Sequence, residues 1–284
     1  MKTILVPLTG HDNDAKALDA AFLVARRFQA RIHCLHVEPD PMRIVSQVAV
    51  QQFSSRLGNV ELIHAMEKEA KFRRGNADAA YEAFLERRFK NASADEKPTL
   101  ERIEGDPVSE TISAARYRSL LVLARAGEGG EFGRDSIANI LVGSGRPILI
   151  ASDGPMDSVG TVVAIAWKES AEAARAVGAA MPFLTGANRA FVLAAPESAG
   201  GKCESEAAER LAKSLRDEGL AAEAHIASPG TASATETLLK AARGKGADLL
   251  VMGAYSHSRM RELVFGGFTR DVLKACDLPV LLLH

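Results

Sequence analysis

Short runs of apolar residues recur along the chain, separated by longer stretches whose apolar residues follow helical spacing. The first run, Thr3–Leu8, precedes a pattern that places Leu18 and Phe22 on one face of a helix, and Arg31–Val37 forms the next run. Short apolar runs bounded by polar turns indicate buried strands, and the 3.6-residue period indicates an amphipathic helix. This strand–helix–strand order predicts the βαβ unit of a doubly wound parallel sheet.

Residues 42–91 show no convincing strand pattern and are predicted to be mostly helical, with interruptions at Gly58-Asn59 and Gly75-Asn76. Phe84 and Phe89 form a late apolar face among charged residues. We expect this segment to pack on the sheet as long helical structure. The alternative is a lid or a partner-binding segment.

The same order of elements then repeats. In the first half, further strands are expected at 100–103, 119–124 and 147–151, with a helix at 107–117. In the second half, strands are expected at 161–167, 189–195, 222–227, 249–252 and 281–283, with helices at 170–183, 204–218 and 234–245. A proline precedes the final strand of each set, at Pro147 and Pro279. The repeat predicts two tandem α/β domains of the Rossmann-like or flavodoxin-like type, at residues 1–152 and 158–284, joined by Asp153-Gly154-Pro155.

Composition excludes several classes of function. The chain has 284 residues, 47% hydrophobic and 25% charged, and a net charge of -1, which indicates a globular protein without the basic field that nucleic acid requires. Three cysteines far apart in sequence, Cys34, Cys203 and Cys276, fit a reducing compartment. No apolar run reaches the length of a membrane span or a signal-peptide core. We therefore expect a cytoplasmic protein that binds neither nucleic acid nor membrane.

Glycines in the last strand–loop–helix unit indicate an anion site. The apolar run at 249–252 stops at Gly253, a polar loop follows, and Gly266-Gly267 and Thr269 precede a helical pattern. Glycines let backbone N–H groups approach phosphate oxygens, and a helix N-terminus adds positive potential. This unit is therefore the main candidate for a binding site.

The spacing of these residues resembles the glycine motif of the universal stress protein family. Gly253, Ser256 and Gly266-Gly267 fall at the family spacing, with Ser256 in place of the middle glycine and Gly267 in place of a small hydroxyl residue. The Asp-Leu-Pro-Val-Leu ending strengthens the resemblance, which covers nearly the whole chain as two tandem copies. The resemblance implies that this loop holds the phosphates and ribose of ATP or a related nucleotide, with Mg²⁺ expected only together with the nucleotide.

Polar side chains around the loop are candidates for ligand contacts. Arg259, Arg261 and Arg270 carry forked guanidinium groups that suit phosphate, and a solvated surface role is the alternative for at least two of them. Thr269 either gives its hydroxyl to a phosphate or caps the following helix. His257 is a further candidate contact, with an ordinary surface position as its alternative.

The residue that follows the first strand of each half also bears on the ligand. Many nucleotide-binding members of the family have an acidic residue there that contacts the nucleoside, whereas this chain has Thr9 in the first half and Lys168 in the second. A lysine favours phosphate or another small anion over an adenosine hydroxyl. Trp167 either lines the pocket or packs as a buried strand residue.

The first half departs further from the motif. Ala124 takes the place of Gly253, and the loop glycines miss the family spacing: Gly127, Gly129, Gly130 and Gly133. An ordinary surface loop is therefore the favoured interpretation. The first half is expected to contribute structure or a dimer surface.

No catalytic or metal-binding set is predicted. His33 and His36 lie on opposite faces of one strand, and the sequence presents no nucleophile with a general base. The leading hypothesis is a cytoplasmic stress-response sensor or regulator that binds nucleotide in its second half, with at most slow ATPase activity. The alternative is a scaffold or chaperone-like partner protein that binds no nucleotide, and a hydrolase or transferase for a small anion ranks third. A homodimer is compatible with each.

Overall fold

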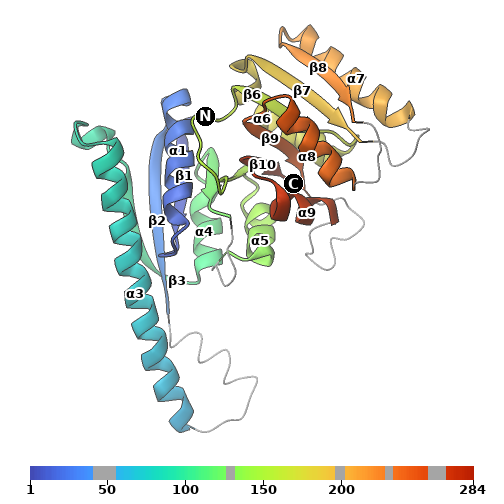
Figure 1. Cartoon of the computed structure of the whole chain (residues 1–284). Coiled ribbons are helices and arrows are strands. Elements are labelled where there is room, and N and C mark those ends of the chain that lie inside the picture. Colours follow the sequence, from blue (N-terminus) through green and yellow to red (C-terminus); the bar gives the residue numbers. More distant parts are fainter. Residues whose placement is uncertain (41–55, 126–131, 196–201, 228–232, 255–266) are drawn as a thin grey trace.

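The computed structural model describes residues 1–40, 56–125, 132–195, 202–227, 233–254 and 267–284. Strands and helices alternate through both halves of the chain (Figure 1), as the sequence pattern predicts. The fold is therefore the predicted doubly wound α/β architecture, present twice.

The first half begins with the predicted βαβ unit and ends with a short strand. Its elements are β1 (Thr3–Leu8), α1 (Asp14–Phe28), β2 (Arg31–Pro39), α3 (Arg56–Arg88), the 3-10 helix η1 (Ala94–Glu96), β3 (Thr99–Gly105), α4 (Pro107–Ala115), β4 (Leu120–Leu123), α5 (Arg134–Ser144) and β5 (Ile148–Ile150).

The second half repeats this order, with the shorter α7 in the place of the long α3. Its elements are β6 (Val162–Ala166), α6 (Ala171–Thr185), β7 (Arg189–Ala194), α7 (Lys202–Asp217), β8 (Ala222–Ile226), α8 (Ala234–Gly244), β9 (Leu249–Gly253), α9 (Gly267–Ala275) and β10 (Val280–Leu283). Each predicted strand is present, with ends shifted by one or two residues.

The ten strands of the described residues form one sheet, in the order β3-β2-β1-β4-β5-β10-β9-β6-β7-β8. Within each half the strands are parallel and follow the Rossmann order, in which the first strand lies between the second and the fourth. The halves meet where β5 and β10 pair antiparallel, with Leu281 opposite Leu149. Because of this antiparallel pairing, the strands of the two halves run in opposite directions, and their carboxyl ends point to opposite sides of the molecule.

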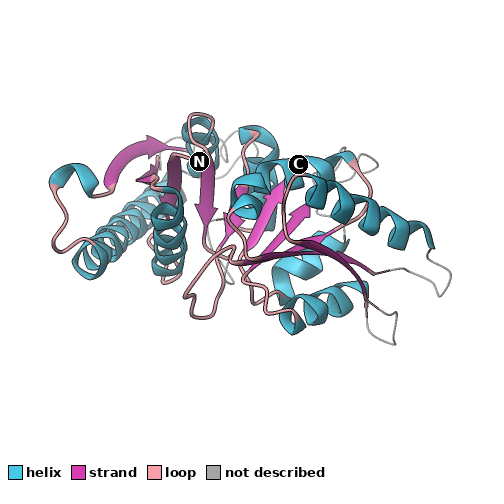
Figure 2. Cartoon of the chain, turned by 90° about the horizontal axis from the view of Figure 1, so that it is seen from above, coloured by secondary structure: helices cyan, strands magenta, loops and turns pink. Residues whose placement is uncertain are grey.

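Helices cover both faces of the sheet (Figure 2). One face packs against α1, α3, α6 and α7, and its core includes Ile4, Leu18 and Phe183. The other packs against α4, α5, α8 and α9, and its core includes Leu121 and Leu250. Successive residues of the inner strands enter the two cores alternately, which is why these strands read as continuous apolar runs rather than as alternating ones.

The predicted interruptions in residues 42–91 are wrong, because α3 runs through Gly58 and Gly75 as one helix of 33 residues. A glycine in a helix costs only about 1 kcal/mol relative to alanine, and packing offsets that cost. Ala77 and Phe84 of α3 are completely buried. Phe84 lies edge-on against Phe22 and Phe89, with ring centroids 6.2 and 5.5 Å apart, so the predicted late apolar face is the one that docks.

Candidate functional site

Two of the second-half candidate residues lie at the point where the chain direction across the sheet reverses. β6 lies between β9 and β7, so the chain leaves β6 toward one side and β9 toward the other. Ala166 pairs with Met252, which places Lys168 and Gly253 at adjacent strand ends. Ligands of open α/β sheets bind in the crevice at such a switch point. The topology therefore brings together two candidates that are far apart in sequence.

Gly253 has a packing reason to be glycine. A Cβ atom on it would lie 2.5 Å from the backbone nitrogen of Ala173 and 2.6 Å from the carbonyl carbon of Glu172, both in the first turn of α6. Ser170 caps that turn by accepting a hydrogen bond of 3.2 Å from the Ala173 N–H. Any larger residue at position 253 would displace α6, so this glycine by itself does not require a ligand.

Gly267 and Thr269 differ in exposure. Gly267 is the first residue of α9 and is exposed, and an added Cβ would have no described atom within 4 Å. Thr269 is the third residue of α9 and is only 5% exposed. The capping alternative for Thr269 is wrong, because a capping residue precedes the helix and Thr269 lies inside its first turn.

Several predicted contacts lie outside the described residues, namely Ser256, His257, Arg259, Arg261 and Gly266. Of the remaining candidates, Lys168 and Arg270 are exposed. Arg270 lies 3.5 Å from its neighbour Asp271. Trp167 is half-buried against the core, and its indole N–H is buried without an acceptor among the described residues. Among the candidate residues that the structure describes, Lys168 is thus the one with a positive charge at the end of β6, at the switch point.

Sequence reasoning missed a buried acidic residue beside Gly253. Glu172 is 3% exposed, and its carboxylate lies 3.3 Å from Arg175. Arg175 also donates a 3.0 Å hydrogen bond to the carbonyl of His284, whose ring Nδ1 is 3.0 Å from the carbonyl of Ala254. These contacts tie α6 to the ends of β9 and β10. The spacing of Glu172 and Arg175 on one helix is the only sequence signal for it, and such pairs are common on surfaces.

In the first half, the corresponding loop after β1 is filled by its own chain. Asp14 is 1% exposed and accepts hydrogen bonds from the Thr9 N–H at 3.0 Å, the Thr9 hydroxyl at 3.0 Å and the Gly10 N–H at 2.8 Å. Burial raises the pKa of Asp14, and these hydrogen bonds oppose the rise. The Asp14 carboxylate therefore takes the N–H donors that a bound anion would need.

The helix α3 covers the same loop. Gly10 adopts φ +75°, and a Cβ atom on it would lie 2.2 Å from the carbonyl oxygen of Arg73 in α3. The side-chain amide of Asn76 donates a 3.1 Å hydrogen bond to the Gly10 carbonyl. In Figure 1 α3 passes beside β2 and extends beyond its end. The first-half switch point is thus closed by side chain and helix together.

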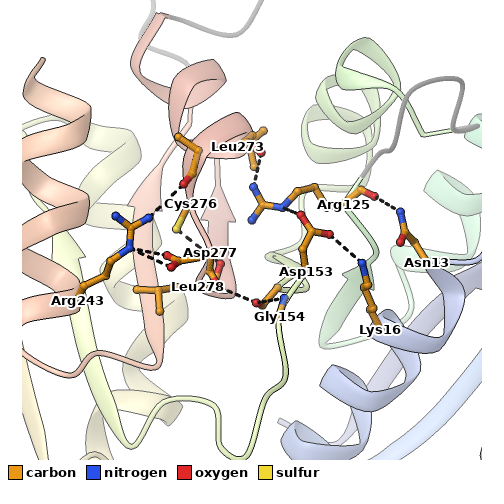
Figure 3. A network of polar contacts seen from close by, with 12 residues as sticks. Asn13, Lys16, Arg125, Asp153, Gly154, Arg243, Leu273, Cys276, Asp277 and Leu278 are labelled. Carbon is orange, nitrogen blue, oxygen red and sulfur yellow. Dashed lines mark hydrogen bonds and ion pairs between the residues drawn. The ribbon is translucent and has the colours of Figure 1, made fainter.

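At the end of β4, Arg125 occupies the other side of that switch point. Its guanidinium reaches α9 and the linker residue Asp153 rather than open crevice (Figure 3). The two halves therefore share a fold but differ in what stands at their switch points.

Metal and membrane features are not found among the described residues. No group of three or more His, Cys, Asp or Glu side chains in these ranges is placed to hold a metal ion. Within the same ranges, no helix combines the length and apolar character that crossing a bilayer requires. His33 and His36 hydrogen-bond separately, to the Thr99 hydroxyl and to the Leu8 carbonyl.

These features define a tandem α/β protein whose two switch points are lined by different residues, and comparisons with known proteins give its family. The profile of the universal stress protein family matches residues 1–144 and again residues 145–284. The chain belongs to the universal stress protein family, in tandem form, as the glycine spacing predicts.

Solved structures agree on the fold over the full chain. A universal stress protein from Archaeoglobus fulgidus DSM 4304 is 18% identical, with a TM-score of 0.66 over 99% of this chain and 95% of that chain. A functionally unknown protein, PA1789 from Pseudomonas aeruginosa PAO1, is 13% identical, with a TM-score of 0.59 over 100% of this chain and 92% of that chain. Universal stress protein Slr1230 of Synechocystis is 44% identical over 48 residues, a match that spans only 17% of either chain.

Proposed function

We propose that this protein is a cytoplasmic stress-response regulator whose second half binds the phosphates of a nucleotide of the ATP type at the β6–β9 switch point. The observation that carries the proposal is the contrast between the halves. Asp14, α3 and Arg125 occupy the first switch point, whereas Lys168 and Gly267 are exposed at the second. A single anion site per chain follows.

The chemistry of the described residues suits phosphate. Lys168 supplies a positive charge at the end of β6, and the N-terminus of α9 supplies N–H donors and positive potential. The predicted contacts Ser256, His257, Arg259 and Gly266 precede α9 in the chain and would complete the site. We propose no catalytic step for this site. We also propose that the two domains comprise residues 1–152 and 158–284.

Equilibrium dialysis of the full chain tests the site with ATP, ADP and cAMP. The last is included because one solved universal stress protein is in complex with cAMP. The proposal predicts one bound ATP per chain. Lys168→Ala should weaken ATP binding roughly three- to tenfold, since a single partly solvated charge contact is worth about 1 kcal/mol. Gly267→Val should weaken it more, because the side chain would stand over the helix N-terminus.

Matched variants separate a local effect from a general one. Lys90→Ala removes the same charge from an exposed position of the first half and should leave ATP binding unchanged. Because an added Cβ at Gly267 has no described atom within 4 Å, Gly267→Val should retain the wild-type unfolding midpoint. Wild-type-like ATP binding in both Lys168→Ala and Gly267→Val would remove the site from this half.

The second candidate function is a scaffold or chaperone-like partner protein that binds no nucleotide. Gly253 favours it, because contact with α6 accounts for this glycine without a ligand. Lys168 also favours it, because the family's acidic nucleoside contact is missing. A protein that takes up none of the three nucleotides, and that captures an unfolding client in an aggregation assay, would support this function instead. We also propose that the protein forms a homodimer. Light scattering of the protein as it elutes from a size-exclusion column would give its mass and so test this.

A further inference from the structure

Arg125 leaves the first half and contacts the helix that carries the proposed anion site. It follows β4, and its side chain is only 11% exposed. Its Nη1 donates a hydrogen bond to the carbonyl oxygen of Leu273, in the last turn of α9 (Figure 3). A first-half guanidinium thus lies at the C-terminus of a helix whose N-terminus faces the second switch point.

A carboxylate from the linker holds the Arg125 guanidinium in place. Asp153 Oδ2 lies 3.1 Å from Arg125 Nε, an ion pair without hydrogen-bond geometry, and Asp153 Oδ1 lies 3.3 Å from the Lys16 ammonium of α1. The Asn13 side-chain amide donates a 3.2 Å hydrogen bond to the Arg125 carbonyl. Both the side chain and the backbone of Arg125 are therefore anchored to first-half and linker residues.

The second half supplies its own contacts to the same end of α9. Arg243 donates to the Ala275 carbonyl at 3.3 Å and to the Asp277 carboxylate at 2.8 and 3.0 Å. Ser152, the last residue of the first half, donates a 2.6 Å hydrogen bond to the Asp277 carbonyl, which follows α9. Cations are favourable at a helix C-terminus, where carbonyl groups lack partners inside the helix. Arg125 differs from Arg243 in that it reaches α9 from the other half.

The length of α9 makes these end contacts consequential. It has nine residues, and helices this short are marginal without tertiary support. Its buried side chains are Thr269, Val272 and Leu273. Loss of the contact at Leu273 would fray the last turn, and in so short a helix fraying also shifts the N-terminal turn that presents N–H groups to an anion.

We infer that Arg125 is a positioning residue for the anion site of the second half, acting through α9. The effect on ligand rests on the proposed function, whereas the hold on α9 is measurable in the protein without ligand. The closed first half thereby has a role. The segment just after the carboxyl end of β4, where a phosphate-binding loop would begin, supports the anion site of the second half.

The first half offers a matched control in Arg116. Its Nε and Nη2 donate to the Gly143 carbonyl near the end of α5, at 3.2 and 3.0 Å. Arg116 is therefore also an arginine at a helix C-terminus, but it acts within its own half. Arg116→Met should loosen α5 without affecting α9.

Amide hydrogen exchange of the full chain without ligand tests the hold on α9. Arg125→Met should speed exchange in residues 267–275 roughly tenfold, the factor for loss of a contact worth about 1.4 kcal/mol. Arg125→Lys keeps the charge but not the fork, and should give a smaller increase. Asp153→Asn should also speed exchange there. Unchanged α9 exchange in Arg125→Met, or an increase no larger than that in the rest of the chain, would overturn the inference.

ATP dialysis on the same proteins tests the consequence for the site. Arg125→Met should weaken ATP binding several-fold, Arg125→Lys should recover part of it, and Arg116→Met should match wild type. Faster α9 exchange with unchanged ATP affinity would overturn the positioning role. Absence of ATP binding by the wild type would refute the proposed function instead, and the exchange data would still decide whether Arg125 holds α9.

Discussion

Replacing Gly10 by alanine should separate α3 from the first-half switch point. Gly10 is buried and has φ +75°, a conformation that disfavours side chains. An added Cβ would lie 2.2 Å from the Arg73 carbonyl oxygen and 2.6 Å from the Arg73 Cα. Both atoms belong to the backbone of a helix, so no side-chain rotation relieves the overlap.

The expected loss of stability follows from two effects. The left-handed conformation costs alanine about 1–2 kcal/mol more than glycine. Overpacking against a fixed backbone costs typically about 1–3 kcal/mol. The reduced freedom of the unfolded chain returns about 0.4–1 kcal/mol. The net loss for Gly10→Ala is therefore about 1–5 kcal/mol, and a urea midpoint would fall by roughly 0.5–2.5 M for a slope near 2 kcal/mol/M.

Gly75→Ala is the matched control in the same contact region. Gly75 lies within α3, and an added Cβ meets nothing within 4 Å. Alanine is the better helix former, so this variant should gain about 0.5–1 kcal/mol. The assay is urea unfolding of both variants, with hydrogen exchange of α3 as the local measure. A Gly10→Ala protein within about 0.5 kcal/mol of wild type would refute the view that α3 closes this loop.

Two further predictions concern titrating groups. Burial raises the pKa of Cys34 and Cys276, whereas Cys203 is exposed, so a disulfide reagent at neutral pH should modify one thiol rapidly and the other two only on unfolding; rapid reaction of a second thiol would contradict this burial. Burial first, and then Arg118 and Arg31, lower the pKa of His33. The unfolded chain therefore binds the His33 proton more readily, and the contribution of His33 to stability is present above about pH 6.5 and is lost as pH falls. His33→Gln should lose less stability than wild type between about pH 7.5 and about pH 5.5 in urea titrations, and parallel curves would count against the prediction.

The sequence predicts the inner strands well because they are buried on both faces. Runs such as Leu120–Leu123 and Leu249–Gly253 have no polar face to obscure the pattern. The sequence does not predict that β5 pairs with β10, because antiparallel pairing of two short apolar strands leaves no local signal in the sequence. The predicted interruption at Gly75 is wrong, because the packing of other residues of α3 offsets the low helix propensity of glycine.

The candidate site also combines features that the local sequence indicates with contacts that only the fold creates. Spacing predicts Gly253, Gly267 and Thr269 as ligand contacts, which stays a prediction, and the contact of Gly253 with α6 exists only in three dimensions. Asp14 looks like an ordinary acidic residue of a first helical turn, and only the fold shows its carboxylate on the Thr9 and Gly10 N–H groups. Arg125 carries no motif, because its partners come from α9 and the linker.

The most direct test of the account is native mass spectrometry of the full chain with ATP, which counts bound molecules. The proposed site in the second half and the closed switch point of the first half predict a single bound ATP per chain, strongly weakened in Gly267→Val and retained in Lys90→Ala. Two bound ATP molecules per chain would contradict the closure of the first half. A single ATP that persists in Gly267→Val would contradict the assignment of the site to the second.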